Sequence, residues 1–62
     1  MQPKARSLAL ETKQGQMEAW EVDVPGNYWE FYVREPNNTL WEIKLNAQTG
    51  AVLSAEQKAA RD

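Results

Sequence analysis

Carboxylates are the side chains in this sequence that could most readily do chemistry. The 62-residue chain has nine Asp and Glu residues and has neither His nor Cys. The missing types exclude thiolate nucleophiles, His-based triads, disulfides and the usual zinc sites. Carboxylates could still act as a general acid and base, provided that burial in a pocket raises the pKa of one of them. Glu21, Asp23, Glu30 and Glu42 fall at positions typical of a solvated sheet face, so we expect them to be charged and non-catalytic.

Other motifs of catalysis or ligand binding are missing from the sequence. It contains no phosphate loop, calcium loop or nucleophile elbow. A net charge of −2 gives no basic footprint for nucleic acid. Apolar runs reach only three residues, as in Phe31–Val33, which is too short for a membrane span or a signal peptide. We therefore predict no enzyme, no cofactor, no metal, no nucleic-acid partner and no membrane insertion by this segment.

Alternation of apolar and polar residues predicts β-strands that could position these side chains. The alternating segments are residues 17–24, 28–35 and 39–46. Pro25 and Gly26 favour a type II turn between the first two strands. A later turn, Asn46–Gly50, precedes a brief strand at 51–53. Residues 54–62 are polar, and we expect them to be frayed or loosely helical.

A short helix is predicted at residues 3–14, where small and apolar residues recur with helical spacing. Pro3 suits the first turn of a helix. Gly15 is placed to end it in a left-handed conformation. One helix packed on a three- to four-stranded antiparallel meander gives an α+β fold, with residues 1–62 as a single small domain.

One face of the strands collects large apolar side chains, which we predict to form the core under the helix. They are Trp20, Val22, Val24, Trp29, Phe31, Val33, Trp41, Ile43 and Leu45. The same pattern sets the register of the second hairpin. Val33 should pair with Trp41, which places Glu30 opposite Lys44 as a favourable charge pair.

Four residues on the otherwise polar face are candidates for contact with a protein partner. They are Tyr28, Tyr32, Arg34 and Leu40. Tyr and Arg are enriched at protein interfaces, which favours a shallow contact patch. The alternative is that these side chains only support cross-strand contacts on an exposed sheet.

The segments Tyr28–Val33 and Leu40–Leu53, with the turn Asn46-Ala47-Gln48-Thr49-Gly50, resemble the PepSY domain. That family usually has Asp where this turn has Asn46, and its order of elements fits residues 5–54. The resemblance implies a small non-catalytic module that is periplasmic, secreted or on the cell surface, and that inhibits or restrains a peptidase. It brings no catalytic residues, and Asn46 and Gly50 are expected to be structural.

Two alternatives remain open from the sequence. The small core favours a self-associating structural domain, a homodimer formed through a sheet edge or a swapped helix. Trp20–Glu21, Phe31–Val33 and Asn38–Glu42 also resemble a WW domain, which would bind proline-rich peptides. Against the second alternative, no Pro follows Trp41, and that residue falls on the predicted core face.

Overall fold

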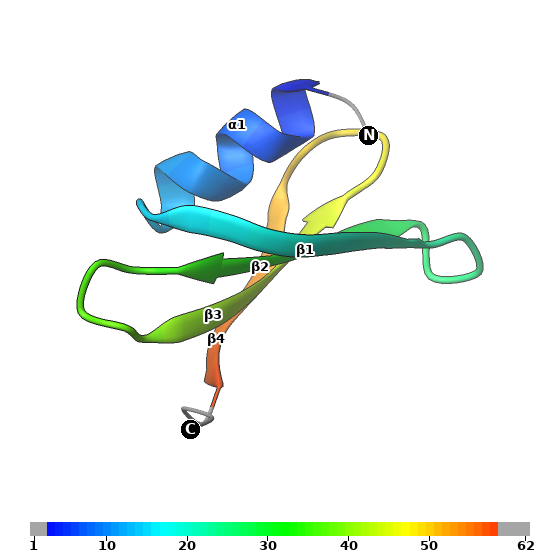
Figure 1. Cartoon of the computed structure of the whole chain (residues 1–62). Coiled ribbons are helices and arrows are strands. Elements are labelled where there is room, and N and C mark those ends of the chain that lie inside the picture. Colours follow the sequence, from blue (N-terminus) through cyan, green and yellow to red (C-terminus); the bar gives the residue numbers. More distant parts are fainter. Residues whose placement is uncertain (1–2, 59–62) are drawn as a thin grey trace.

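The computed structural model describes residues 3–58 as one helix packed on a four-stranded antiparallel sheet. The elements are α1 (Pro3–Thr12), β1 (Gln16–Asp23), β2 (Tyr28–Arg34), β3 (Leu40–Asn46) and β4 (Val52–Lys58). Neighbouring strands in the chain are neighbours in the sheet, in the order β1-β2-β3-β4. Figure 1 shows α1 over one face of the sheet and nothing over the other, which we call the open face. The predicted α+β fold is confirmed.

The second hairpin has the register that the sequence predicts. Val33 pairs with Trp41, and Glu30 pairs with Lys44. A slip of one residue would turn every apolar side chain to the open face, so burial of one face fixes the pairing.

The core lies between α1 and the two central strands. Its buried members are Ala5, Ala9, Phe31, Val33, Ile43 and Leu45, and the partly buried residues packed around them are Leu8, Leu10, Met17, Trp29 and Trp41. The helix contributes small residues one turn apart, which lets its backbone approach the large side chains of the sheet.

Trp20 and Val22 do not belong to the core, contrary to the sequence prediction. They lie on the predicted face, opposite Phe31 and Trp29, but they are 46% and 45% exposed. Val24, beyond the end of β1, is 78% exposed. The ten-residue helix packs mainly on β2 and β3 and leaves the outer strand uncovered. Alternation therefore identified the face but not how far the helix extends over it.

Strand β4 is longer than predicted. It pairs with β3 from Val52 to Lys58, where the sequence indicated a strand at 51–53 and then a frayed tail. The polar residues of this segment satisfy backbone hydrogen bonds of β3 without adding to the core, so apolar alternation gives no sign of them. A register shift leaves Leu53 as an extra residue in the ladder. Residues 59–62 of the predicted tail lie outside the described residues.

The turn between β1 and β2 is not type II as predicted. A positive φ occurs at Asn27 (57°) rather than at Gly26. The Asn27 N–H donates to the Val24 carbonyl at 3.2 Å, and Asp23 Oδ1 accepts the Gly26 N–H at 2.7 Å. This is a type I turn with Pro25 at its second position. It is followed by a left-handed residue, a conformation that Asn tolerates.

Gly15 has a different role from the predicted helix end. The helix α1 ends at Thr12, and Gly15 does not have a positive φ. A Cβ at this position would collide with the Arg34 carbonyl oxygen. Glycine is needed because the segment between α1 and β1 passes directly against the end of β2.

Candidate functional site

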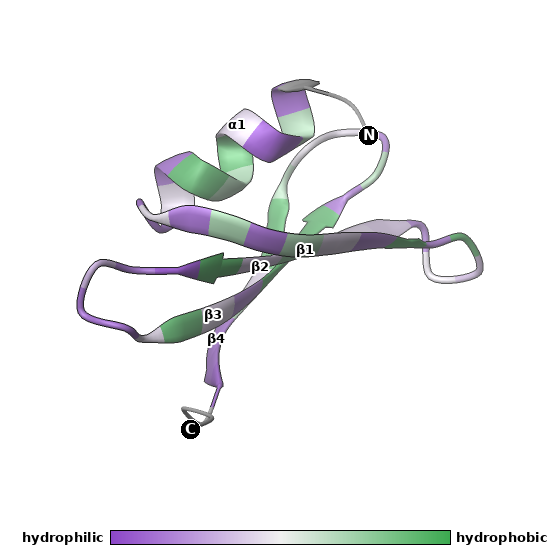
Figure 2. Cartoon of the chain, in the orientation of Figure 1, coloured by the Kyte–Doolittle hydropathy of each residue, from purple (hydrophilic) through white to green (hydrophobic). Residues whose placement is uncertain are grey.

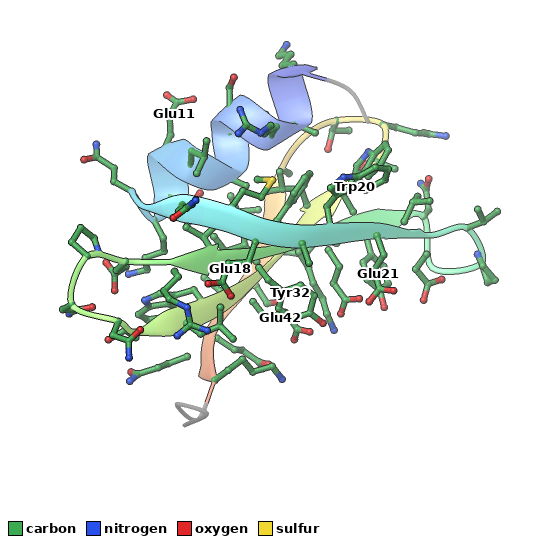
Figure 3. All side chains as sticks on the ribbon, viewed as in Figure 1. Glu11, Glu18, Trp20, Glu21, Tyr32 and Glu42 are labelled. Carbon is green, nitrogen blue, oxygen red and sulfur yellow. The ribbon has the colours of Figure 1, made fainter. Side chains whose placement is uncertain are left out.

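The four predicted contact residues lie together on the open face. Tyr28, Tyr32 and Arg34 alternate along β2, and Leu40 of β3 pairs with Arg34. All four are half-buried. Figure 3 shows Tyr32 on the side of the sheet opposite to Trp20. Tyr28 and Arg34 stand at opposite ends of β2, so the patch is as long as the strand.

Glu42 lies at the centre of the open face and is only 7% exposed, so the prediction that it is solvated is wrong. The Tyr32 hydroxyl donates to its Oε2 at 2.8 Å, and Lys58 Nζ lies 3.4 Å from its Oε1. Burial raises the pKa of Glu42, but hydrogen bonds from Tyr32 and Glu30 and the charge of Lys58 outweigh it and lower the pKa. The same bond raises the pKa of Tyr32. Residues of β2, β3 and β4 are thus tied together by one carboxylate.

Glu30 is the titrating partner of this carboxylate. Burial raises the pKa of Glu30 to about 7, together with its hydrogen bond to Glu42 and the nearby charges of Glu42 and Glu21. The sequence places Glu30 on a solvated face and does not predict this raised pKa. Desolvation disfavours the charged form of a carboxyl group, and two neighbouring carboxyl groups cannot both ionise freely.

Arg34 is held at one end of the open face by residues from two other segments. Its Nη2 donates to Glu18 Oε1 at 3.1 Å, and its Nη1 donates to the Asn38 carbonyl at 3.1 Å. The hydrogen bond lowers the pKa of Glu18 and raises that of Arg34. Glu18 is the extra residue where the register of β1 against β2 shifts. The bulge thus directs this carboxylate to the guanidinium.

Tyr28 marks the other end of the open face. A hydrogen bond to Asp23 raises the pKa of its hydroxyl. Lys44 Nζ lies 5.2 Å from the centre of its ring. The polar atoms of the predicted contact residues are therefore engaged within the domain, and Leu40 and the parts of the Tyr rings that Lys44 does not cover remain for an apolar contact.

A cavity of about 60 Å³ lies on the helix side of the sheet, lined in part by Lys4, Leu8 and Trp29. Small-molecule sites are usually about 300–1,000 Å³, so this cavity has room for about two water molecules. Among residues 3–58, no cluster of three or more Asp, Glu, His or Cys side chains could hold a metal ion. No helix in that part of the chain is long and apolar enough to cross a membrane.

The turn between β3 and β4 supports the helix. Asn46 Oδ1 accepts the backbone N–H groups of Gln48 and Thr49 at 2.8 and 2.9 Å. Gly50 has a φ of 78°, and a Cβ there would lie 2.8 Å from Leu8 Cδ1. The helix is thus seated on a turn whose shape requires Asn or Asp at its start and Gly at its end.

Residues 4–56 match the family model for PepSY, the peptidase propeptide and YPEB domain. The chain belongs to the PepSY family. No curated protein and no solved structure matched the chain. The match runs from α1 into β4 and includes the turn from Asn46 to Gly50, so the resemblance found in the sequence is confirmed.

The PepSY domain also has an exposed apolar strip that sequence reasoning placed in the core. It consists of Trp20 and Val22 on β1, the first strand of the sheet. Hydrophobic and hydrophilic residues alternate along β1 in Figure 2. The Trp20 ring lies 5.6 Å from the ring of Trp29, tilted by 54°, so one side of it rests on the sheet. The sequence could have indicated this strip through the length of the predicted helix, because so few helical residues cannot cover four strands.

Proposed function

We propose that this PepSY domain is a non-catalytic protein-binding module that restrains a peptidase outside the cytoplasm, and that the peptidase contacts the open face. The family description, a peptidase propeptide domain, supports the class of partner. PepSY domains are typically extracellular or periplasmic. The observation that carries the location of the contact is a sheet face that no described element covers and that presents two Tyr rings and Leu40.

The hydrogen bonds within the open face favour binding. Association costs free energy when side chains must be ordered and polar groups must be desolvated. Tyr32 is already fixed by Glu42, and Arg34 is already fixed by Glu18. A partner that packs on these side chains therefore meets a surface whose conformation is set and whose polar atoms are largely satisfied.

Affinity capture from an extracytoplasmic fraction, followed by an inhibition assay on the peptidase retained, tests this function. The informative variant is Leu40→Asp, which places a charge at the Arg34 end of the proposed contact. The matched control is Leu53→Asp on β4, where the wild-type side chain is 53% exposed. We expect Leu40→Asp to weaken inhibition at least tenfold and Leu53→Asp to leave it unchanged.

Circular dichroism establishes that both variants fold. A peptidase inhibited equally by the wild type and the Leu40→Asp variant would contradict the open-face contact. Failure of the wild type to retain or inhibit any peptidase would contradict the function itself.

A further inference from the structure

The strand β1 lies at one end of the sheet order and, in the described part of the chain, pairs only with β2. The outer side of such a strand carries backbone N–H and C=O groups that can accept a further strand. The strand is eight residues long, which is enough for several backbone hydrogen bonds with a partner.

The helix side of β1 offers apolar contact. Trp20 and Val22 are both nearly half exposed and are two positions apart. Side chains two positions apart on a strand are separated by roughly 7 Å and point to the same face. A neighbouring strand with apolar residues at every second position would therefore place one of them beside each of these side chains.

The opposite side of β1 is acidic. Glu21 pairs with Glu30, so two carboxyl groups lie side by side on β1 and β2. An open depression of about 510 Å³ lies at this end of the strand and is lined by Glu21, Val22, Asp23, Val24, Pro25 and Glu30. Its lining has three carboxyl groups and lacks a cationic side chain. Lys44, opposite Glu30 on β3, offsets one of these charges and leaves the site negative.

We propose that β1 is a docking edge for an extended segment of a partner protein in which Lys or Arg alternates with apolar residues. Added beside β1 as a fifth strand, the segment places its apolar side chains against Trp20 and Val22. Its cationic side chains then lie on the other face, near Glu21 and Glu30. This interaction uses the edge of β1 and reaches the open face at Glu21 and Glu30, and it does not depend on the restraint of a peptidase.

A second copy of the chain fits this edge less well. Its own β1 would bring the same carboxylates, Glu18, Glu21 and Asp23, to a surface that already carries them. The whole chain has a net charge of −2, and like charges opposed across a strand pair are destabilising. A basic partner removes this repulsion.

The other outer strand provides the internal control. On β4, Val52 is 50% exposed, close to the 45% of Val22, and it pairs with core residue Leu45. The open-face side of β4 carries Glu56 as well as Lys58, which is bound to Glu42, so its charges balance, whereas β1 carries acidic residues without a cation. The proposed charge preference therefore favours β1 over β4.

The test uses the full chain, labelled with ¹⁵N, and an eight-residue peptide of alternating Lys and Val with blocked ends. We expect the peptide to shift the amide signals of β1 and the indole signal of Trp20, and to leave β4 unaffected. Val22→Lys should weaken binding at least tenfold, whereas Val52→Lys should change it less than twofold. Trp20→Lys serves as the second edge variant if Val22→Lys does not fold.

Three further peptides separate strand pairing from simple charge attraction. Replacing every Lys by Glu should abolish binding. Two N-methylated peptides complete the test, one methylated at the backbone nitrogen of every Lys and the other at that of every Val. Only one of the two should lose binding, because alternate N–H groups of an added strand face β1. The proposal would be overturned if the peptide did not bind at millimolar concentration or if the Glu peptide bound equally well. It would also be overturned if both N-methylated peptides bound equally, or if Val22→Lys and Val52→Lys had equal effects.

Discussion

Glu30 and Glu42 lie diagonally across the ladder between β2 and β3 and have pKa values displaced in opposite directions. Burial, with a hydrogen bond to Glu42, raises the pKa of Glu30 to about 7, whereas hydrogen bonds from Tyr32 and Glu30 outweigh burial and lower the pKa of Glu42. Figure 3 places Glu42 beside Tyr32, whose hydroxyl supplies a second donor. The pair makes the open face a proton-binding surface near neutral pH, and this has consequences for stability.

The first prediction concerns stability against pH. Because the folded pKa of Glu30 is about 7 and its ordinary value is 4.5, the folded state holds this proton more tightly than the unfolded state. The stabilisation is complete below about pH 4.5 and is lost as the pH rises through 7. As the pH rises from 5 to 8, ionisation of Glu30 should lower the free energy of unfolding by about 1–2 kcal/mol, after allowance for partial exposure.

Glu30→Gln should remove this loss, since the amide stays neutral and can still donate to Glu42. We expect the variant to be more stable than the wild type at pH 8 in urea unfolding, with the difference reduced at pH 5. Glu11→Gln, at an exposed position of α1, is the control and should not alter the pH dependence. A wild type equally stable at pH 5 and 8 would show that Glu30 titrates normally.

Removal of the Tyr32 hydroxyl should destabilise the domain at neutral pH. Tyr32→Phe leaves the buried Glu42 carboxylate without one of its donors, and hydrogen bonds to charged groups are worth about 1.5–3 kcal/mol. We expect a loss of about 2 kcal/mol in urea unfolding at pH 7. Tyr28→Phe, whose hydroxyl bonds the side chain of Asp23 at the end of the sheet, should cost less. Equal losses for both variants would mean that the buried carboxylate does not need Tyr32.

The turn between β3 and β4 predicts an ordered series of variants. Asn46→Asp keeps the oxygen that accepts two N–H groups and should be tolerated, whereas Asn46→Ala loses both bonds and should cost about 1–2 kcal/mol. Gly50→Ala should cost more, since it combines a φ of 78° with a collision against Leu8. Thermal unfolding gives the order, with Gln48→Ala as the control. A fully stable Gly50→Ala variant would show that α1 does not depend on this turn.

Some features of this fold could be predicted from sequence and others could not, for physical reasons. The pairing of Val33 with Trp41 followed from alternation, because burial of one face determines register. The exposure of Trp20 could not be predicted from alternation, because it depends on how far α1 extends across the sheet. The raised pKa of Glu30 could not be predicted either, since it arises from burial and from carboxyl groups on the two neighbouring strands. The positions of the site residues were predictable, and their environments required the structure.

The last prediction links the proposed docking edge to the carboxyl pair. A cationic side chain placed near Glu30 favours its ionised form and lowers its pKa, so binding of the Lys–Val peptide should release a proton near pH 7. The charged groups that already face Glu30 are Glu21 on β1 and Glu42 and Lys44 on β3.

Since the ionised form binds more tightly, affinity should increase from pH 6 to pH 8 and become constant above that range. Calorimetry in two buffers of different ionisation enthalpy measures the proton released. Glu30→Gln should bind more weakly at pH 8 and show a flat pH profile, while Glu11→Gln should behave as the wild type. Proton uptake on binding, or an affinity that falls as the pH rises, would place the cationic side chains of the peptide away from Glu30. The peptide would then engage β1 through its apolar side chains alone, and the acidic half of the proposed specificity would be wrong.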